Sequence, residues 1–151
     1  MKNLNTYINE KLKIVHKSYS CAPKTKLELK EILKERLNQD PNADLNDIDV
    51  SNITDMSSLF DLLDPHNIDI SQWDVSKVKD MGHMFWGCYN FNSDISRWDV
   101  SKVEDMNRMF CACKNFNIDL SHWNVSKVKY MNHVFDGCNS MKELPDWYMK
   151  S

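Results

Sequence analysis

Five cysteines are the residues of this chain that could carry metal or redox chemistry. Cys111 and Cys113 form a Cys-x-Cys pair, but no second pair follows at the spacing of a zinc site. Cys88, Cys113 and Cys138 stand 25 residues apart, which indicates one repeated, packed position. The odd number of cysteines argues against a disulfide framework. We therefore predict reduced, packed thiols and neither a metal nor a cofactor.

Aspartates recur on the same step, and stacked carboxylates repel one another unless they bind a cation or accept backbone N–H bonds. A calcium ladder is one alternative, but no Gly-rich calcium motif accompanies these aspartates. Turn and cap hydrogen bonding is the interpretation that we favour. The three sets are Asp49/Asp74/Asp99, Asp55/Asp80/Asp105 and Asp69/Asp94/Asp119.

Histidines are the remaining candidates for catalysis. None of the five lies near a Ser-Gly elbow or another nucleophile motif. The chain has only 3 Gly, which argues against loops that cradle phosphate groups. We therefore predict that the protein is not an enzyme.

These residues belong to a 25-residue repeat, whose complete units read DISQWDVSKVKDMGHMFWGCYNFNS, DISRWDVSKVEDMNRMFCACKNFNI and DLSHWNVSKVKYMNHVFDGCNSMKE. A degenerate unit precedes them. A partial last unit, ELPDWYMKS, needs a one-residue deletion to place Leu144 and Trp147. Stacked units turn each apolar position into a continuous buried column. Such columns are Trp73/Trp98/Trp123, Met81/Met106/Met131 and Phe85/Phe110/Phe135.

The spacing within a unit predicts its local structure. Met106, Met109, Phe110 and Cys113 fall at i, i+3, i+4 and i+7, the stripe of one helix face. Short helices are therefore expected near 80–88, 105–113 and 130–138. The segment DISRWDV is rich in β-formers and predicts a short strand that pairs with its neighbours at about 4.8 Å. The predicted fold of residues 44–151 is an α/β repeat solenoid of leucine-rich-repeat type, with a short strand and a short helix in each coil.

The repeat pattern D-I/L-S-x-W-D/N-V-S-K-V-x-D-M-x-x-M-F-x-x-C-x-x-F-N resembles the mycoplasma-type lipoprotein repeat, also described as the BspA-like leucine-rich-repeat surface protein family. The resemblance covers about residues 44–144. It implies a curved solenoid that makes protein–protein contacts, often at bacterial surfaces. It implies no enzymatic activity and no catalytic residues.

Residues 1–43 do not repeat and predict an N-terminal α-helical hairpin cap. An amphipathic stripe marks a first helix, and the capping box from Thr25 to Glu28 opens a second one that runs to Leu37. Because the end of a repeat stack exposes its core, we expect the hairpin to cover the first coil. The alternative is a hairpin that binds a partner or another copy. The first stripe consists of Leu4, Tyr7, Ile8, Leu12 and Val15.

Charge is unevenly divided along the chain. Residues 1–43 hold 9 basic and 5 acidic residues, a net of +4, and residues 44–151 hold 10 and 17, a net of −7. The negative balance of the repeats disfavours nucleic acid as a partner. No apolar run is long enough to span a membrane, and no leader is recognisable. We predict a cytoplasmic protein, or a cell-surface or secreted one if a leader was removed.

Positions where the repeat varies are the best candidates for function. Trp86 and Tyr89 lie one helical turn apart, and tryptophan, tyrosine and arginine are the usual anchors of protein interfaces. We predict a protein-binding patch formed by His83, Trp86, Tyr89 and Arg108 and extended by His133.

The sequence thus predicts a non-catalytic protein-binding module. One version is a small cytoplasmic binder or inhibitor of the kind that a phage or mobile element encodes. A second version is a bacterial surface or adhesin-type repeat protein. An enzyme is a third and disfavoured alternative. The partner and the oligomeric state are left open.

Overall fold

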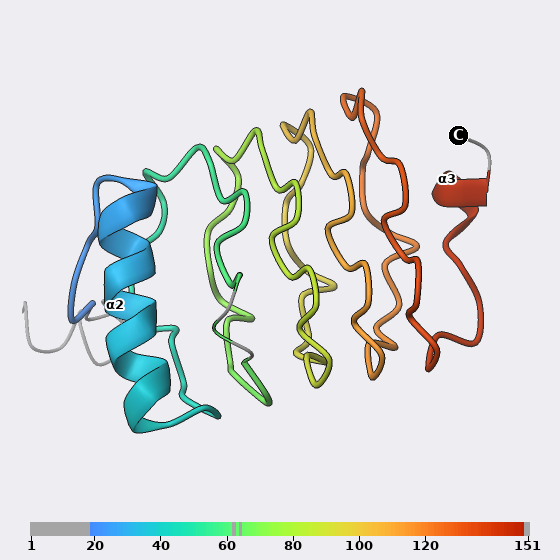
Figure 1. Ribbon diagram of the computed structural model, residues 1–151. Helices are drawn as coiled ribbons and strands as arrows, with labels where there is room; N and C mark the ends of the chain where they lie inside the picture. Colours follow the sequence, from blue (N-terminus) through green and yellow to red (C-terminus); the bar gives the residue numbers. More distant parts are fainter. Residues whose placement is uncertain (1–18, 62, 64, 150–151) are drawn as a thin grey trace, which may run out of the picture.

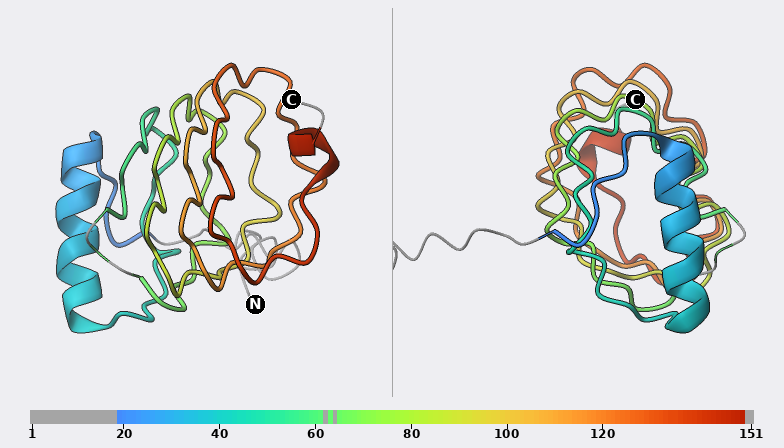
Figure 2. Two further views of the ribbon diagram at one scale, coloured as in Figure 1. Left: turned by 45° about the vertical axis from the view of Figure 1, so that its right-hand side comes forward. Right: turned by 90° about the vertical axis from the view of Figure 1, so that its left-hand side faces the viewer.

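The computed structural model describes residues 19–149 except residues 62 and 64. Within these residues it has two α-helices, α2 (Lys26–Gln39) and α3 (Asp146–Met149), and no named strand. Between the helices the chain winds into successive coils, with α2 at one end of the stack and α3 at the other (Figure 1). Seen along the stack, the coils superimpose on one another (Figure 2). Each 25-residue repeat is therefore one circuit of the chain around a shared core.

The predicted α/β solenoid, with a strand and a helix in every coil, is wrong for the described residues. The segments expected as helices, 80–88, 105–113 and 130–138, are consecutive turns. Parallel pairing occurs as isolated bridges, and the longest series of them joins Asp55, Asp80, Asp105 and Tyr130. DISRWDV, expected as the paired strand, is not part of that series.

Backbone hydrogen bonding explains why no helix forms in the coils. An α-helix needs each N–H to bond the carbonyl four residues earlier. Here the N–H of Met84 closes a four-residue turn onto the carbonyl of Met81 at 3.1 Å, while the N–H of Phe85 donates to the carbonyl of Met109 in the next coil at 2.9 Å. Alternate N–H groups thus point along the stack, and the helical pattern is lost.

Tight turns also interrupt the segments expected as strands. In the DISRWDV segment, the N–H of Trp98 closes a turn onto the carbonyl of Ile95 at 3.1 Å. A chain that turns every few residues cannot run extended for long enough to build a sheet. The parallel bridges between coils therefore remain isolated and do not extend into a strand.

Stacked side chains form the core, as the repeat predicts. Phe60, Phe85 and Phe110 are fully buried, and their rings stack in series with centroids 5.0 and 5.6 Å apart. Trp73 and Trp98 stack at 6.3 Å, with their planes nearly parallel. Burying one such side chain stabilises the fold by roughly 1.5–3 kcal/mol. A single coil could not bury these faces alone.

The deletion predicted in the last unit is confirmed. Trp123 donates its Nε1–H to the carbonyl of Ile95, 28 residues earlier. Trp147 makes the equivalent bond to the carbonyl of Leu120, only 27 residues earlier, and stacks on Trp123 at 6.5 Å. The start of α3 therefore continues the tryptophan column one residue early.

Helix α2 covers the first coil. Thr25 Oγ1 accepts a hydrogen bond from the N–H of Glu28 at 3.2 Å, which confirms the predicted helix start. Lys26 Nζ lies 2.7 Å from Asp55 Oδ2, and Lys30 Nζ donates to the carbonyl of Ser58, so the helix is tied to the coil by charged groups as well. Its buried face consists of Leu29, Leu33 and Leu37. The first predicted helix of the hairpin lies outside the described residues.

Neither described helix has the length and apolar character that crossing a bilayer requires.

Candidate functional site

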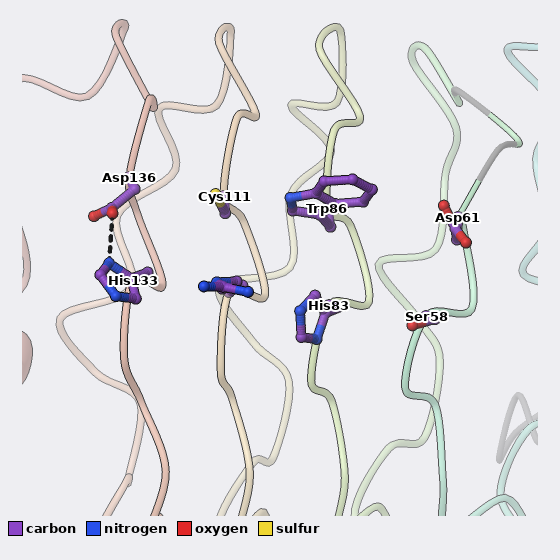
Figure 3. A pocket seen from close by; sticks show the side chains of 8 residues that line it. Ser58, Asp61, His83, Trp86, Cys111, His133 and Asp136 are labelled. Atoms are coloured by element: carbon purple, nitrogen blue, oxygen red, sulfur yellow. Dashed lines mark hydrogen bonds and ion pairs between the residues drawn. The ribbon is translucent and has the colours of Figure 1, made fainter.

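A groove of about 690 Å³ crosses four successive coils on one face of the stack (Figure 3). Two rows of side chains line it, with one residue of each row on every coil. The first, the left-handed row, is Ser58, His83, Arg108 and His133. The second, the turn-end row, is Asp61, Trp86, Cys111 and Asp136.

A turn joins the two rows within every coil. The N–H of Trp86 donates to the carbonyl of His83 at 3.0 Å, and the N–H of Cys111 donates to the carbonyl of Arg108 at 3.1 Å. Between coils, the N–H of His83 donates to the carbonyl of Asn107 at 2.8 Å. The backbone therefore sets the position of each row both across the groove and along it.

The left-handed row takes its name from its backbone. Ser58, His83, Arg108 and His133 have φ of 53°, 58°, 53° and 59°, where a residue with a Cβ costs about 1–2 kcal/mol. Glycine would adopt this conformation without that cost. Side chains retained at strained positions motivate a functional hypothesis for the row.

Contacts within the groove differ from coil to coil. His133 Nδ1 lies 2.7 Å from Asp136 Oδ2, and the dashed line in Figure 3 marks this pair. His83 meets the Trp86 ring edge-on, with centroids 6.5 Å apart. Arg108 is exposed, and the structure gives its guanidinium no hydrogen-bond or ion-pair partner among the described residues. Trp86 is 48% exposed.

A smaller hollow of about 320 Å³ opens on the left-handed row. Its lining is His83, Asn107, Arg108, Asn132 and His133. These five residues include no carboxylate. The amide of Asn132 donates to Asn107 Oδ1 at 3.3 Å, so the two asparagines hold each other across neighbouring coils.

Of the predicted patch, His83, Trp86, Arg108 and His133 lie together in the groove. Tyr89 is exposed but is not part of the groove lining, and Lys114 Nζ sits 4.7 Å from the centroid of its ring. Sequence reasoning missed the other members of the lining. Their signal was present, because they occupy the same two repeat columns as the predicted residues. The missed residues are Ser58, Asp61, Cys111 and Asp136.

None of the five cysteines forms a disulfide in the structure, and all five lie among the described residues. Cys113 Sγ donates to the carbonyl of Phe85 at 2.9 Å, and Cys138 Sγ to the carbonyl of Phe110 at 3.1 Å. Burial raises the pKa of the Cys113 thiol, and it raises the pKa of Cys138 to about 12. These sulfur atoms serve the packing between coils. No group of metal-ligating side chains is found among residues 19–149, apart from 62 and 64.

The aspartate sets accept turn hydrogen bonds, as predicted. Asp94 Oδ1 accepts from the Ser96 hydroxyl at 2.6 Å and from its N–H at 3.0 Å, and these bonds lower the pKa of the Asp94 carboxyl. Asp99 and Asp119 make the equivalent N–H bonds to Ser101 and Ser121, and their pKa values are lowered for the same reason. The carboxylates thus tie the turns that carry the coils.

A family model described as "Mycoplasma protein of unknown function, DUF285" matches residues 28–147. No curated protein and no solved structure matches the chain.

Proposed function

Since this chain belongs to the DUF285 family of Mycoplasma proteins of unknown function, we propose a role that rests on its own surface: it is a non-catalytic module that binds another protein through the four-coil groove. One observation carries the proposal. Trp86 and Arg108 lie on neighbouring coils and both line the groove. The Trp86 ring is half exposed, and the Arg108 guanidinium has no partner among the described residues.

The side-chain types support this role. Tryptophan and arginine supply much of the binding energy at protein interfaces, and they do so best when the free protein already holds them in place. Turns and bonds between coils hold the backbone at Trp86 and Arg108, and the His83 ring packs edge-on against the Trp86 ring. A partner could therefore contact the exposed part of the Trp86 ring without the cost of ordering the backbone around it.

The proposal also covers the cellular compartment of the protein and its relationship to other repeat families. We place the protein in the cytoplasm as a stoichiometric binder or inhibitor, and the BspA-like surface proteins as its distant kin. Reduced cysteines are part of this proposal, because the cytoplasm keeps thiols reduced. Thiol titration of freshly isolated protein tests this, and oxidised cysteines would favour the surface alternative.

Affinity capture tests the binding role. The tagged full chain is incubated with lysate of the native host, and bound proteins are identified by mass spectrometry. The double variant Trp86→Ala, Tyr89→Ala is expected to lose a partner that the wild-type chain retains. Tyr130→Ala is the matched control, because Tyr130 is 54% exposed but does not line the groove.

Circular dichroism confirms that each variant is folded before it is used. Equal capture by the wild-type chain and a folded double variant would reject the groove as the binding surface. Loss of capture with Tyr130→Ala as well would point to a general effect of removing surface aromatics.

A further inference from the structure

The small hollow on the left-handed row has a chemistry that identifies the kind of group it receives. This inference rests on the proposed function, because it assigns a part of the same protein-binding surface. The side chains around the hollow are one guanidinium, two imidazoles and two carboxamides. Guanidinium donates only, and imidazole and carboxamide can both donate hydrogen bonds. A ligand that mainly accepts hydrogen bonds fits this lining.

Arg108 is the charged centre of the hollow. Its neighbours in the row, His83 and His133, stand on the coils before and after it. Three other basic residues, Lys26, Arg36 and Lys129, each face a carboxylate at 2.5–2.9 Å. Arg108 has no such carboxylate among the described residues, so its planar fork of donors stays available for an external acid.

The surroundings sharpen this choice. Residues 44–151 carry a net charge of −7, which repels an extended polyanion such as nucleic acid at long range. A single carboxylate on a protein segment meets that repulsion to a much smaller extent. The acidic residues of the groove, Asp61 and Asp136, lie in the turn-end row at its two ends (Figure 3). Asp136 Oδ2 pairs with Nδ1 of His133 at 2.7 Å, which leaves the other ring nitrogen of His133 for a ligand.

Trp86 supplies the neighbouring apolar contact. It belongs to the coil of His83 and lines the larger groove that shares the left-handed row with the hollow. An apolar side chain next to the bound acid in the partner would cover the exposed part of this ring.

We infer that the hollow binds a side-chain or terminal carboxylate of the partner protein through Arg108, His83 and His133, while an adjacent apolar side chain of the partner packs on Trp86. Asn107 and Asn132 complete the donor lining. Arg108 is the residue on which the recognition of the acid depends.

The test is a nuclear magnetic resonance titration of the isotopically labelled full chain. The probe is a capped pentapeptide of alanine, leucine, glutamate and two further alanines. The expected result is movement of the backbone signals of His83, Arg108 and His133. Replacing glutamate by glutamine in the probe should weaken binding by about tenfold, because an ionic hydrogen-bond acceptor is lost.

Two variants localise the effect. Arg108→Gln should weaken binding of the glutamate peptide by about tenfold. Arg97→Gln should leave it unchanged, because Arg97 is also an exposed arginine of the repeats but does not line the hollow or the groove. Binding unaffected by Arg108→Gln, or no movement of the three signals, would overturn the inference.

The same titration is repeated with a five-nucleotide oligothymidylate and with inorganic phosphate, and their affinities are compared with that of the glutamate peptide. Tighter binding of either one than of the glutamate peptide would overturn the assignment to a protein carboxylate. The lysate capture described above separates the two proposals. If Trp86→Ala abolishes capture and Arg108→Gln does not, the groove still binds protein and only the carboxylate site is rejected.

Discussion

The indole N–H of Trp98 donates to the main-chain carbonyl of Ile70 in the preceding coil at 3.1 Å. The same bond joins Trp73 to Leu45 at 2.9 Å. Since Trp98 is only 4% exposed, its polar N–H needs this partner. The repeated tryptophan thus contributes to each coil a stacked apolar ring and a hydrogen bond that aligns the coil with the preceding one.

Trp98→Phe is therefore expected to destabilise the fold by about 1–3 kcal/mol, because the carbonyl of Ile70 loses one of its two donors, keeping the N–H of Trp73, and the smaller ring fills the buried column less completely. Urea unfolding measures the change. Trp86→Phe is the matched control, since Trp86 is 48% exposed, and it should shift the free energy of unfolding by less than about 0.5 kcal/mol. Equal effects of the two substitutions would contradict the role of the N–H.

Arg108→Gly is expected to raise stability by up to about 1 kcal/mol. The left-handed backbone at φ 53° costs arginine energy that glycine avoids, and the larger entropy of glycine in the unfolded chain offsets part of the gain. Arg108→Val should lower stability, because a β-branched residue fits this region poorly. Chemical denaturation measures both, and a glycine variant less stable than wild type would refute the strain argument.

Stability should fall in acid as the turn carboxylates are protonated. The Ser96 hydroxyl and N–H hold the pKa of Asp94 below its usual value of 3.8. A lowered folded-state pKa stabilises the fold fully above the unfolded value, and this contribution is lost as the pH falls through the folded value. Asp94→Asn should show a shallower fall in the free energy of unfolding between about pH 5 and pH 2. An unchanged slope would show that Asp94 does not contribute.

Thiol labelling should separate the cysteines by position. Burial raises the pKa of Cys113, so its thiolate is scarce at neutral pH, while Cys111 is only partly buried. We expect iodoacetamide to modify Cys111 of the folded protein first and Cys113 only after denaturation. Mass spectrometry of proteolytic peptides that separate the two sites measures this order. Fast labelling of Cys113 in the native protein would contradict the packing described here.

The repeat columns were predictable from the residues alone. Met106, Met109, Phe110 and Cys113 were expected on one stripe, and all four are fully buried. The start of α2 at Thr25 and the shortened last unit were also readable from local chemistry. In each case a residue type at a set spacing allows one low-energy arrangement.

The candidate site was only partly predictable. Its two columns were visible as positions that vary between units, but the exclusion of Tyr89 and the inclusion of Asp61 and Asp136 were not. These outcomes depend on where each turn directs its side chains. The left-handed φ at His83 and its equivalents sets that direction, and no residue type there required it.

Residue types and their 25-residue spacing identify most of the buried positions, while the tertiary structure sets the path that the backbone takes to reach them. A stripe at i, i+3, i+4 and i+7 fits an α-helix and a series of tight turns equally well. Hydrogen bonds between coils decide between helix and turns. The N–H of Phe85, for example, donates to the carbonyl of Met109 in the next coil and not to a carbonyl of its own segment. Because that carbonyl comes into reach only when the coils stack, a single repeat does not contain the information that makes it a turn.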